Sequence, residues 1–247
     1  MKIILNILTH GDERIGVKVA KELEKLKIDK NIFVVQIANK KAFELGERFV
    51  DQDLNRSFPG KKDGNREERI AYELSPIIRS ADLVIDIHST KSELKDAIIV
   101  TKLDAATRGC ITAIAPKYAL IMNATRDNAL ISEAKIGLAF EYGKDNDKKT
   151  LEKIIADIKR IFQYFGLIDA VPKKRKIATQ YFDVFSRVDK PNGYKLFKKI
   201  KNYRLVRKGE KFAKNGSDYL TANEDFYPIL FGEKNYKDYF GFRARRI

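Results

Sequence analysis

Hydrophobic and polar positions along the first two thirds of the chain predict strands that alternate with helices. Short apolar runs rich in Ile, Val and Leu predict strands at 2–9, 31–38, 81–88, 96–101 and 135–143. Helices are predicted at 13–27, 65–80 and 148–166. In the first of these helices the apolar side chains fall on one face, at Ile15, Val19, Leu23 and Leu26. Alternation of this kind is typical of an α/β fold with a mostly parallel or mixed central sheet and helices on both faces.

The pattern changes in the last third of the chain. From Ile177 onward the apolar runs are short and rich in Tyr, Phe and Val, and "KPNGY", "RKGEK" and "KNGSD" supply turn signals between them. We therefore predict two domains, an α/β domain at 1–170 and a small β-rich domain at 171–247. In the helix at 65–80, Pro76 predicts a kink or a break.

Length and composition fit a globular protein with a sizeable core. The chain has 247 residues, 44% of them hydrophobic, and a single cysteine, Cys110, which excludes an internal disulfide framework. The sequence contains neither a secretory signal pattern nor an apolar run long enough to span a membrane. We expect a cytoplasmic protein with no membrane partner, and the sequence leaves open whether it forms a homo-oligomer.

The net charge of +15 is concentrated in the predicted β-rich domain, where 20 Lys and Arg stand against 8 Asp and Glu. Such asymmetry fits either a solvated lysine-rich face or a polyanion-binding surface. Because "YKLFKKIKNYRLVRKG" alternates like a half-buried strand and carries no RNA-binding signature, a nucleic-acid partner is the alternative rather than the expectation.

Both histidines of the chain lie at predicted strand ends. His10 follows the first strand, with Glu13 three residues later, and His88 ends the strand at 81–88. Because sites in open α/β sheets form beyond the carboxyl ends of the strands, these side chains could converge. Two imidazoles and one carboxylate are the ligand set of a catalytic zinc ion. Each residue alone could be structural. Asp86, two residues before His88, could orient a ligand or be an ordinary strand residue.

Two further features could carry chemistry. Glu141 ends the strand at 135–143, where it could relay a proton or pair with a lysine. The segment "ERFVDQDLNRSFPG" at 47–60 is a loop dense in hydrogen-bonding groups. In it, Arg56 could clamp a carboxylate, Asn55 could donate a hydrogen bond and Arg48 could stabilise an oxyanion. The alternative is a surface loop held together by its own salt bridges.

These motifs together resemble a known family. "THGDE", "RFVDQDLNRSFPG", "DIHST" and the strand-end "EYG" occur in the order found in the succinylglutamate desuccinylase/aspartoacylase family. That family is a branch of the zinc carboxypeptidase-like fold. The late "EDFYPILFGEKNYKD" is also similar to the family's C-terminal segment.

The resemblance implies a role for each candidate residue. His10, Glu13 and His88 would bind one zinc ion per chain, and Glu141 would be the general base. Arg48 would polarise the scissile carbonyl. Further residues would contact the substrate: Asn55, Arg56, Tyr227 and, for an acyl-side carboxylate, Arg126. The implied reaction is hydrolysis of the amide bond of an N-acyl amino acid or similar small carboxylate. Alternatives are a metallocarboxypeptidase acting on short peptides, a nucleic-acid-binding protein that uses the basic C-terminal domain, and an inactive ligand sensor.

Overall fold

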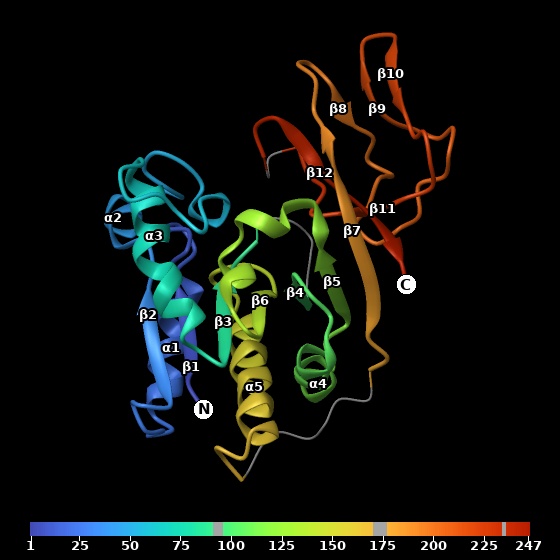
Figure 1. Ribbon diagram of the computed structural model, residues 1–247. Coiled ribbons are helices and arrows are strands. Elements are labelled where there is room, and N and C mark those ends of the chain that lie inside the picture. The colour runs from blue at the N-terminus through green and yellow to red at the C-terminus, as the bar shows by residue number, and fades with distance from the viewer. Residues whose placement is uncertain (91–95, 170–176, 234–235) are drawn as a thin grey trace.

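A nine-stranded mixed sheet forms the centre of the molecule (Figure 1). The computed structural model describes residues 1–90, 96–169, 177–233 and 236–247. The order of strands across the sheet is β11-β12-β7-β5-β4-β6-β3-β1-β2. Neighbours are parallel except at β4/β6, β7/β12 and β11/β12. These strands are β1 (Ile3–Ile7), β2 (Phe33–Ile37), β3 (Leu83–His88), β4 (Ala97–Val100), β5 (Tyr118–Met122), β6 (Gly137–Glu141), β7 (Gln180–Asp189), β11 (Tyr227–Ile229) and β12 (Tyr239–Arg246).

A second, three-stranded antiparallel sheet lies beside the edge of the large sheet that β11 and β12 form. It consists of β8 (Lys195–Leu196), β9 (Lys211–Asn215) and β10 (Asp218–Thr221). The β-rich character predicted for the last third is therefore present. It is divided between this small sheet and one edge of the large one.

Helices cover both faces of the large sheet, as the apolar pattern predicts. The α-helices are α1 (Ile15–Glu24), α2 (Lys40–Leu45), α3 (Arg66–Arg79), α4 (Ala105–Ile114) and α5 (Lys148–Tyr164). Three short 3-10 helices are η1 (Leu54–Arg56), η2 (Asn123–Asn128) and η3 (Leu130–Glu133). No helix in the described part of the chain has the length and hydropathy needed to cross a membrane.

Alternate side chains of β1 enter two different cores. Ile3 and Leu5 pack with apolar residues of α1, α4 and α5 on one face of the sheet, whereas Ile4 packs on the other face with residues of α3. Figure 1 shows α4 and α5 lying across the same face. Because side chains alternate along a strand, burial on both faces explains the near-continuous apolar runs in the sequence.

The helix ends follow from local sequence. Asn65 and Glu68 form a reciprocal capping box at the start of α3, in which each side chain accepts a hydrogen bond from the other residue's backbone N–H. α3 continues through Pro76 to Arg79, so the proline does not end the helix. The start of α1 has no cap within its own sequence. Instead, the Asp145 carboxylate accepts hydrogen bonds from the backbone N–H groups of Arg14 and Ile15.

The sheet continues across the boundary predicted near residue 170. β7 pairs in parallel with β5 in the register Tyr118↔Gln180, and β12 and β11 then add to β7. The division into domains at 1–170 and 171–247 stays a prediction, but backbone hydrogen bonds join the two parts.

Candidate active site

The carboxyl ends of three adjacent strands bring together the two histidines and two of the acids. β3 lies between β1 and β6 in the sheet, and His88 is directly opposite Glu141 in the β3/β6 register. His10 follows β1 by three residues. The sheet topology therefore gathers residues that are far apart in sequence, as the strand-end rule predicts.

The Glu13 carboxylate lies between the two imidazole rings and contacts both of them. Its Oε1 lies 2.8 Å from His10 Nδ1, and its Oε2 lies 2.9 Å from His88 Nδ1. All three side chains are almost completely buried, and one potential ligand atom from each lies within 4.8 Å of the others. This donor set fits a divalent metal ion, and it fits zinc in particular, because two imidazole nitrogens and a carboxylate leave a fourth coordination position open.

Asp86 fixes the orientation of the His88 ring. Its Oδ2 lies 2.8 Å from His88 Nε2, and its Oδ1 accepts hydrogen bonds from Asn6 Nδ2 at 2.8 Å and from Thr9 Oγ1 at 2.7 Å. The Asp86 side chain is fully buried. A carboxylate behind a histidine selects the tautomer and ring orientation that present the other nitrogen to a metal. Here that other nitrogen, Nδ1, faces Glu13.

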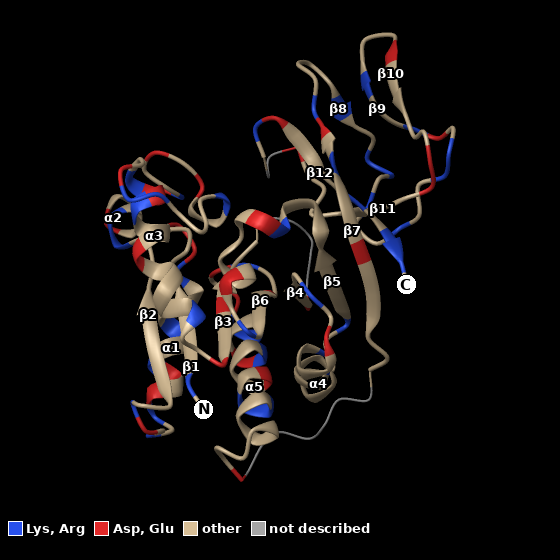
Figure 2. Cartoon of the chain, viewed as in Figure 1, with Lys and Arg blue, Asp and Glu red and all other residues tan. Residues whose placement is uncertain are grey.

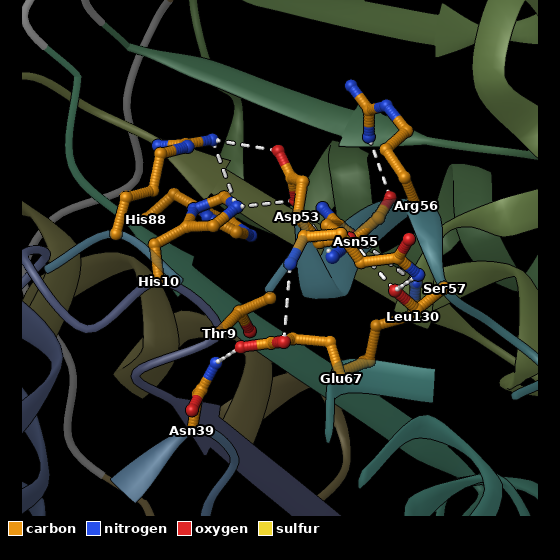
Figure 3. Close-up of polar contacts among 12 residues, drawn as sticks. Thr9, His10, Asn39, Asp53, Asn55, Arg56, Ser57, Glu67, His88 and Leu130 are labelled. Carbon is orange, nitrogen blue, oxygen red and sulfur yellow. Dashed lines mark hydrogen bonds and ion pairs between the residues drawn. The ribbon is translucent and has the colours of Figure 1, made fainter. Parts of the chain in front are cut away.

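A second carboxylate occupies the matching place behind His10. Asp53 Oδ1 lies 3.0 Å from His10 Nε2, and Asp53 Oδ2 lies 3.4 Å from Arg48 Nη2 (Figure 3). Arg48 also donates to Glu13 Oε1 at 3.0 Å. Burial alone would raise the pKa of Asp53, but His10 and Arg48 hold it well below its usual value. Burial likewise would lower the pKa of Arg48, but the Glu13 and Asp53 carboxylates raise it.

Glu141 differs from Glu13, Asp53 and Asp86 in its hydrogen bonds within the described part of the chain. Its Oε2 is buried and has no hydrogen-bond partner among the described residues. Burial raises the pKa of Glu141 to about 7. A carboxylate whose pKa is near neutrality can both accept and return a proton at physiological pH.

The loop at 47–57 supplies the next group of candidates. Asp53 caps η1 by accepting a hydrogen bond from the Asn55 backbone N–H at 2.9 Å. Asn55 Oδ1 accepts from the Leu130 N–H at 2.9 Å, and Arg56 Nη1 donates to the Asn55 carbonyl at 2.7 Å. These bonds place Asn55 and Arg56 in the wall of a small cavity that His10, His88 and Glu141 also line.

Three cavities meet around these residues. The innermost is small, about 60 Å³, and several apolar side chains line it together with the site residues. A cavity of about 740 Å³ opens beside Glu13 and Glu141, and one of about 490 Å³ lies over Arg56. Arg48 lines all three, so the space around the candidate metal ligands divides at this side chain.

Two of the residues implied by the resemblance lie away from these cavities. Tyr227 packs edge-on against Phe182 in the apolar core beside β7 and lines none of the three. Arg126 is exposed in η2 and also lines none of them. Tyr236, nine residues after Tyr227, lines all three and stacks on Tyr239 with ring centroids 4.0 Å apart. The tyrosine beside the site is therefore one that the sequence analysis did not single out, although it lies in the same C-terminal segment.

Comparisons with known proteins show which proteins the chain is similar to. Several relatives match parts of the chain. N-alpha-acetyl-L-2,4-diaminobutyric acid deacetylase of Halomonas elongata is 35% identical over 88 residues, which are 32% of this chain and 26% of that protein. A probable aspartoacylase of a Nostoc species is 31% identical over 110 residues, 39% of this chain and 37% of that protein. In these two alignments the chain thus spans well under half of the relative's length.

A longer alignment joins the chain to an N-acyl-aromatic-L-amino acid amidohydrolase (carboxylate-forming) of Xenopus laevis. It covers 92% of this chain and 88% of that protein at 24% identity. The fold is shared with murine aminoacylase 3, at a TM-score of 0.79 and 17% identity over 100% of this chain and 95% of the other.

The family itself is established by its sequence profile. The profile of the succinylglutamate desuccinylase/aspartoacylase catalytic domain matches residues 2–154, which contain His10, Glu13, His88 and Glu141 together with the loop of Arg48. The chain belongs to the succinylglutamate desuccinylase/aspartoacylase family.

Proposed function

We propose that this protein hydrolyses the amide bond of an N-acyl amino acid with one zinc ion bound by His10, Glu13 and His88. The observation that carries the proposal is the convergence of three ligand atoms within 4.8 Å of one another. Glu141, with an oxygen that has no hydrogen-bond partner among the described residues, lines a cavity that His10 and His88 also line. A bound zinc ion would supply Lewis-acid chemistry that makes water a usable nucleophile at neutral pH and polarises a carbonyl.

The residues of the chain would perform the remaining steps. Glu141 would take a proton from the attacking water and later give it to the amine nitrogen as the C–N bond breaks, because burial raises its pKa to about 7. Arg48, which Glu13 and Asp53 hold by hydrogen bonds, would stabilise the negative charge that develops on the carbonyl oxygen. Asn55 and Arg56 would bind the substrate's α-carboxylate from the wall of the inner cavity.

The inner cavity favours a short, uncharged acyl group. Its apolar lining includes Ile99, Met122, Ala129, Ile131 and Ala139, and its volume is about 60 Å³. Arg126, the candidate for an acyl-side carboxylate, lies outside this cavity. Arg48 and Arg56 also line this cavity, but they are assigned to the scissile carbonyl and to the α-carboxylate. The second carboxylate of a succinyl group would therefore lie in the inner cavity without a cation of its own, which is costly. We therefore propose an acetyl-like acyl group, in line with the named activity of the Halomonas relative.

The lining of the neighbouring cavity favours a large amino-acid side chain of the substrate, with a negatively charged group of the substrate next to it. It has a volume of about 490 Å³, and four aromatic residues line it: Phe49, Tyr236, Tyr239 and Phe242. Four cations, Arg48, Arg56, Arg187 and Lys237, outnumber the two acids in its lining, Asp53 and Asp238. Aromatic walls suit an apolar or aromatic side chain. The substrate class that fits best is an N-acetylated amino acid with such a side chain. The name of the Xenopus relative points to the same class.

A substrate panel with metal analysis tests this function. We expect about one zinc per chain, and we expect hydrolysis of N-acetyl amino acids in preference to N-succinyl amino acids and dipeptides. His10→Ala and His88→Ala should each lose the metal. Preference for dipeptides would favour the carboxypeptidase alternative. A protein that binds no metal and cleaves none of the panel would refute the proposal.

The nucleic-acid alternative has less support from the arrangement of charge. Figure 2 shows acidic residues interspersed with the Lys and Arg of β8, β9 and β10. Some of them form ion pairs, such as Glu210 with Lys199 at 2.8 Å. A salt-sensitive shift of RNA on a gel that chelators do not change would support that alternative. A cytoplasmic location stays a prediction.

A further inference from the structure

A buried acid outside the candidate site holds the loop that carries Arg48. Glu67 lies in the first turn of α3, and its side chain is fully buried. We propose that Glu67 is a positioning residue that sets the place of Arg48 and Asp53 relative to His10. The inference rests on the proposed function insofar as Arg48 acts in the reaction.

Glu67 accepts hydrogen bonds from three consecutive backbone N–H groups. Its Oε1 accepts from Val50 at 2.8 Å, and its Oε2 accepts from Asp51 at 3.0 Å and from Gln52 at 3.3 Å. A fourth donor, Asn39 Nδ2, lies 3.0 Å from Oε1 (Figure 3). Four donors directed at one carboxylate fix both the carboxylate and the chain segment that supplies three of them.

This segment lies directly between two residues of the same loop that contact candidate metal ligands. Arg48 precedes Val50 by two residues and donates to Glu13, and Asp53 follows Gln52 and contacts His10. Glu67 therefore acts on both through a short, hydrogen-bonded stretch of backbone. It touches neither of them through any hydrogen bond of the described structure.

The chain before the segment is held at another point. The Arg48 carbonyl oxygen accepts from the Gly11 N–H at 3.0 Å, next to His10. Gly11 permits this approach because a Cβ there would lie only 2.2 Å from the Ala42 carbonyl carbon. Without Glu67, residues 49–52 would keep the anchor at Arg48, and the described structure would hold them to α3 by one hydrogen bond, from the Arg66 N–H to Asp51 Oδ2 at 2.9 Å.

The chain after the segment has its own supports. Asn55 Oδ1 accepts from Leu130, and the Phe58 N–H donates to the Asn128 carbonyl. Asn55 and Arg56 should therefore keep their places when Glu67 is changed. Loss of Glu67 should therefore disturb Arg48, which is assigned to the carbonyl oxygen, more than Asn55 and Arg56, which are assigned to the substrate's α-carboxylate.

Glu67→Gln is the informative variant. Glutamine keeps the size of the side chain but offers one oxygen acceptor, and its NH₂ group would face backbone N–H donors. Glu68→Gln is the matched control, because it makes the same chemical change one residue later in the same helical turn. The Glu68 carboxylate contacts Lys61 and Asn65 and forms no hydrogen bond with residues 50–52.

Amide hydrogen exchange on the full-length protein tests the placement without relying on activity. In Glu67→Gln we expect peptides covering 49–53 to exchange about tenfold faster or more, as the loss of a buried hydrogen bond implies. Peptides covering 54–60 should exchange at the original rate, and Glu68→Gln should leave both regions unchanged. Unchanged exchange at 49–53, or equal acceleration in Glu68→Gln, would overturn the proposal.

Kinetics on the zinc-loaded protein test the consequence for the reaction. With the N-acetyl amino acid that the unaltered protein cleaves fastest, Glu67→Gln should lower kcat about 10- to 100-fold, and KM should change less than about threefold. Glu67→Asp keeps the charge and should recover part of kcat. A rise in KM at constant kcat would contradict the role. If the unaltered protein cleaves none of the panel, the proposed function fails, while the exchange experiment still decides whether Glu67 fixes the segment.

Discussion

The replacement of Asp86 by Asn tests whether the buried carboxylate behind His88 tunes the candidate metal site. Asp86 accepts three hydrogen bonds, from His88, Asn6 and Thr9, and no part of its side chain is exposed. An asparagine has the same shape but only one oxygen acceptor. If that oxygen stays with Asn6 and Thr9, the new NH₂ group faces His88 Nε2, and the ring loses its carboxylate partner.

The expected loss of zinc affinity in Asp86→Asn follows from the kind of hydrogen bond that is lost. A hydrogen bond to a charged group contributes about 1.5–3 kcal/mol. Because about 1.4 kcal/mol corresponds to a tenfold change in an equilibrium constant, we expect the zinc affinity to fall roughly 10- to 100-fold. His88 and Glu13 are unchanged in the variant, so the site should still bind the ion, only more weakly.

Competition with a chelator of known affinity measures this effect directly. The control is Asp82→Asn, the same substitution on a carboxylate that accepts from the Lys2 N–H and pairs with Lys135 outside the site. Asp82→Asn should leave the zinc affinity within about twofold, as is usual for surface substitutions. An Asp86→Asn protein that binds zinc as tightly as the unaltered protein would refute the reasoning. Equal weakening in both variants would do the same.

Four other expectations can be checked with this protein and its variants. Glu141→Gln should keep the zinc, as measured by elemental analysis, and should lower kcat about 100- to 10,000-fold; retained activity would exclude it as the base. In the unaltered protein kcat/KM should fall on acidification below pH about 7, or somewhat lower with the cation bound, because a cation favours the ionised carboxylate. Tyr236→Phe should raise KM whereas Tyr227→Phe should not, since only Tyr236 lines the cavities. Burial would raise the pKa of Glu67, but hydrogen bonds from Val50 and Asn39 lower it, so its stabilisation is present above its ordinary pKa of 4.5 and is lost as acid protonates it. In urea unfolding at decreasing pH, the free energy of unfolding should fall less steeply for Glu67→Gln than for the unaltered protein.

The sequence predicts that His10 and His88 lie close together because their positions depend on rules of sheet topology. His88 ends β3, His10 follows the parallel strand β1 by three residues, and the ends of parallel strands meet at one edge of a sheet. The apolar period of the first helix predicts which residues of α1 are buried, and Ile15, Val19 and Leu23 are. Both predictions depend on local sequence patterns, namely where a strand ends and how apolar residues are spaced along a helix. Contacts with distant parts of the chain do not alter these patterns.

Other features depend on contacts that no local pattern encodes. α4 and β5 were not predicted, although Cys110 and Leu120 are fully buried in them. The segment of α4 contains Gly109 and two threonines, which are weak helix formers, and only three residues separate it from the short apolar run of β5. The hydrogen bonds of Glu67 to 50–52 cross a gap in sequence of 15 residues or more. In the sequence Glu67 reads only as an acid in the first turn of a helix, where acids are common.

The C-terminal segment gives a second example of a feature that the local sequence does not determine. The resemblance of "EDFYPILFGEKNYKD" implies that Tyr227, which precedes a proline, lies near the site, but Tyr236, nine residues later, is the one of the two that lines the cavities. Strand β11 directs Tyr227 to the apolar core, and the chain must pass beyond β11 before Tyr236 reaches the cavities. Only the path of the chain in space distinguishes them.

The parallel pairing of β7 with β5 has a practical consequence for anyone who would isolate the catalytic part. A fragment limited to 2–154 would stop inside α5 and would leave the outer edge of β5 with unsatisfied backbone donors and acceptors. Open edges of this kind recruit strands from other molecules and lead to aggregation. Such a fragment would also lack Tyr236. We therefore expect it to be insoluble on expression, and the smallest workable unit of this protein to extend through β12.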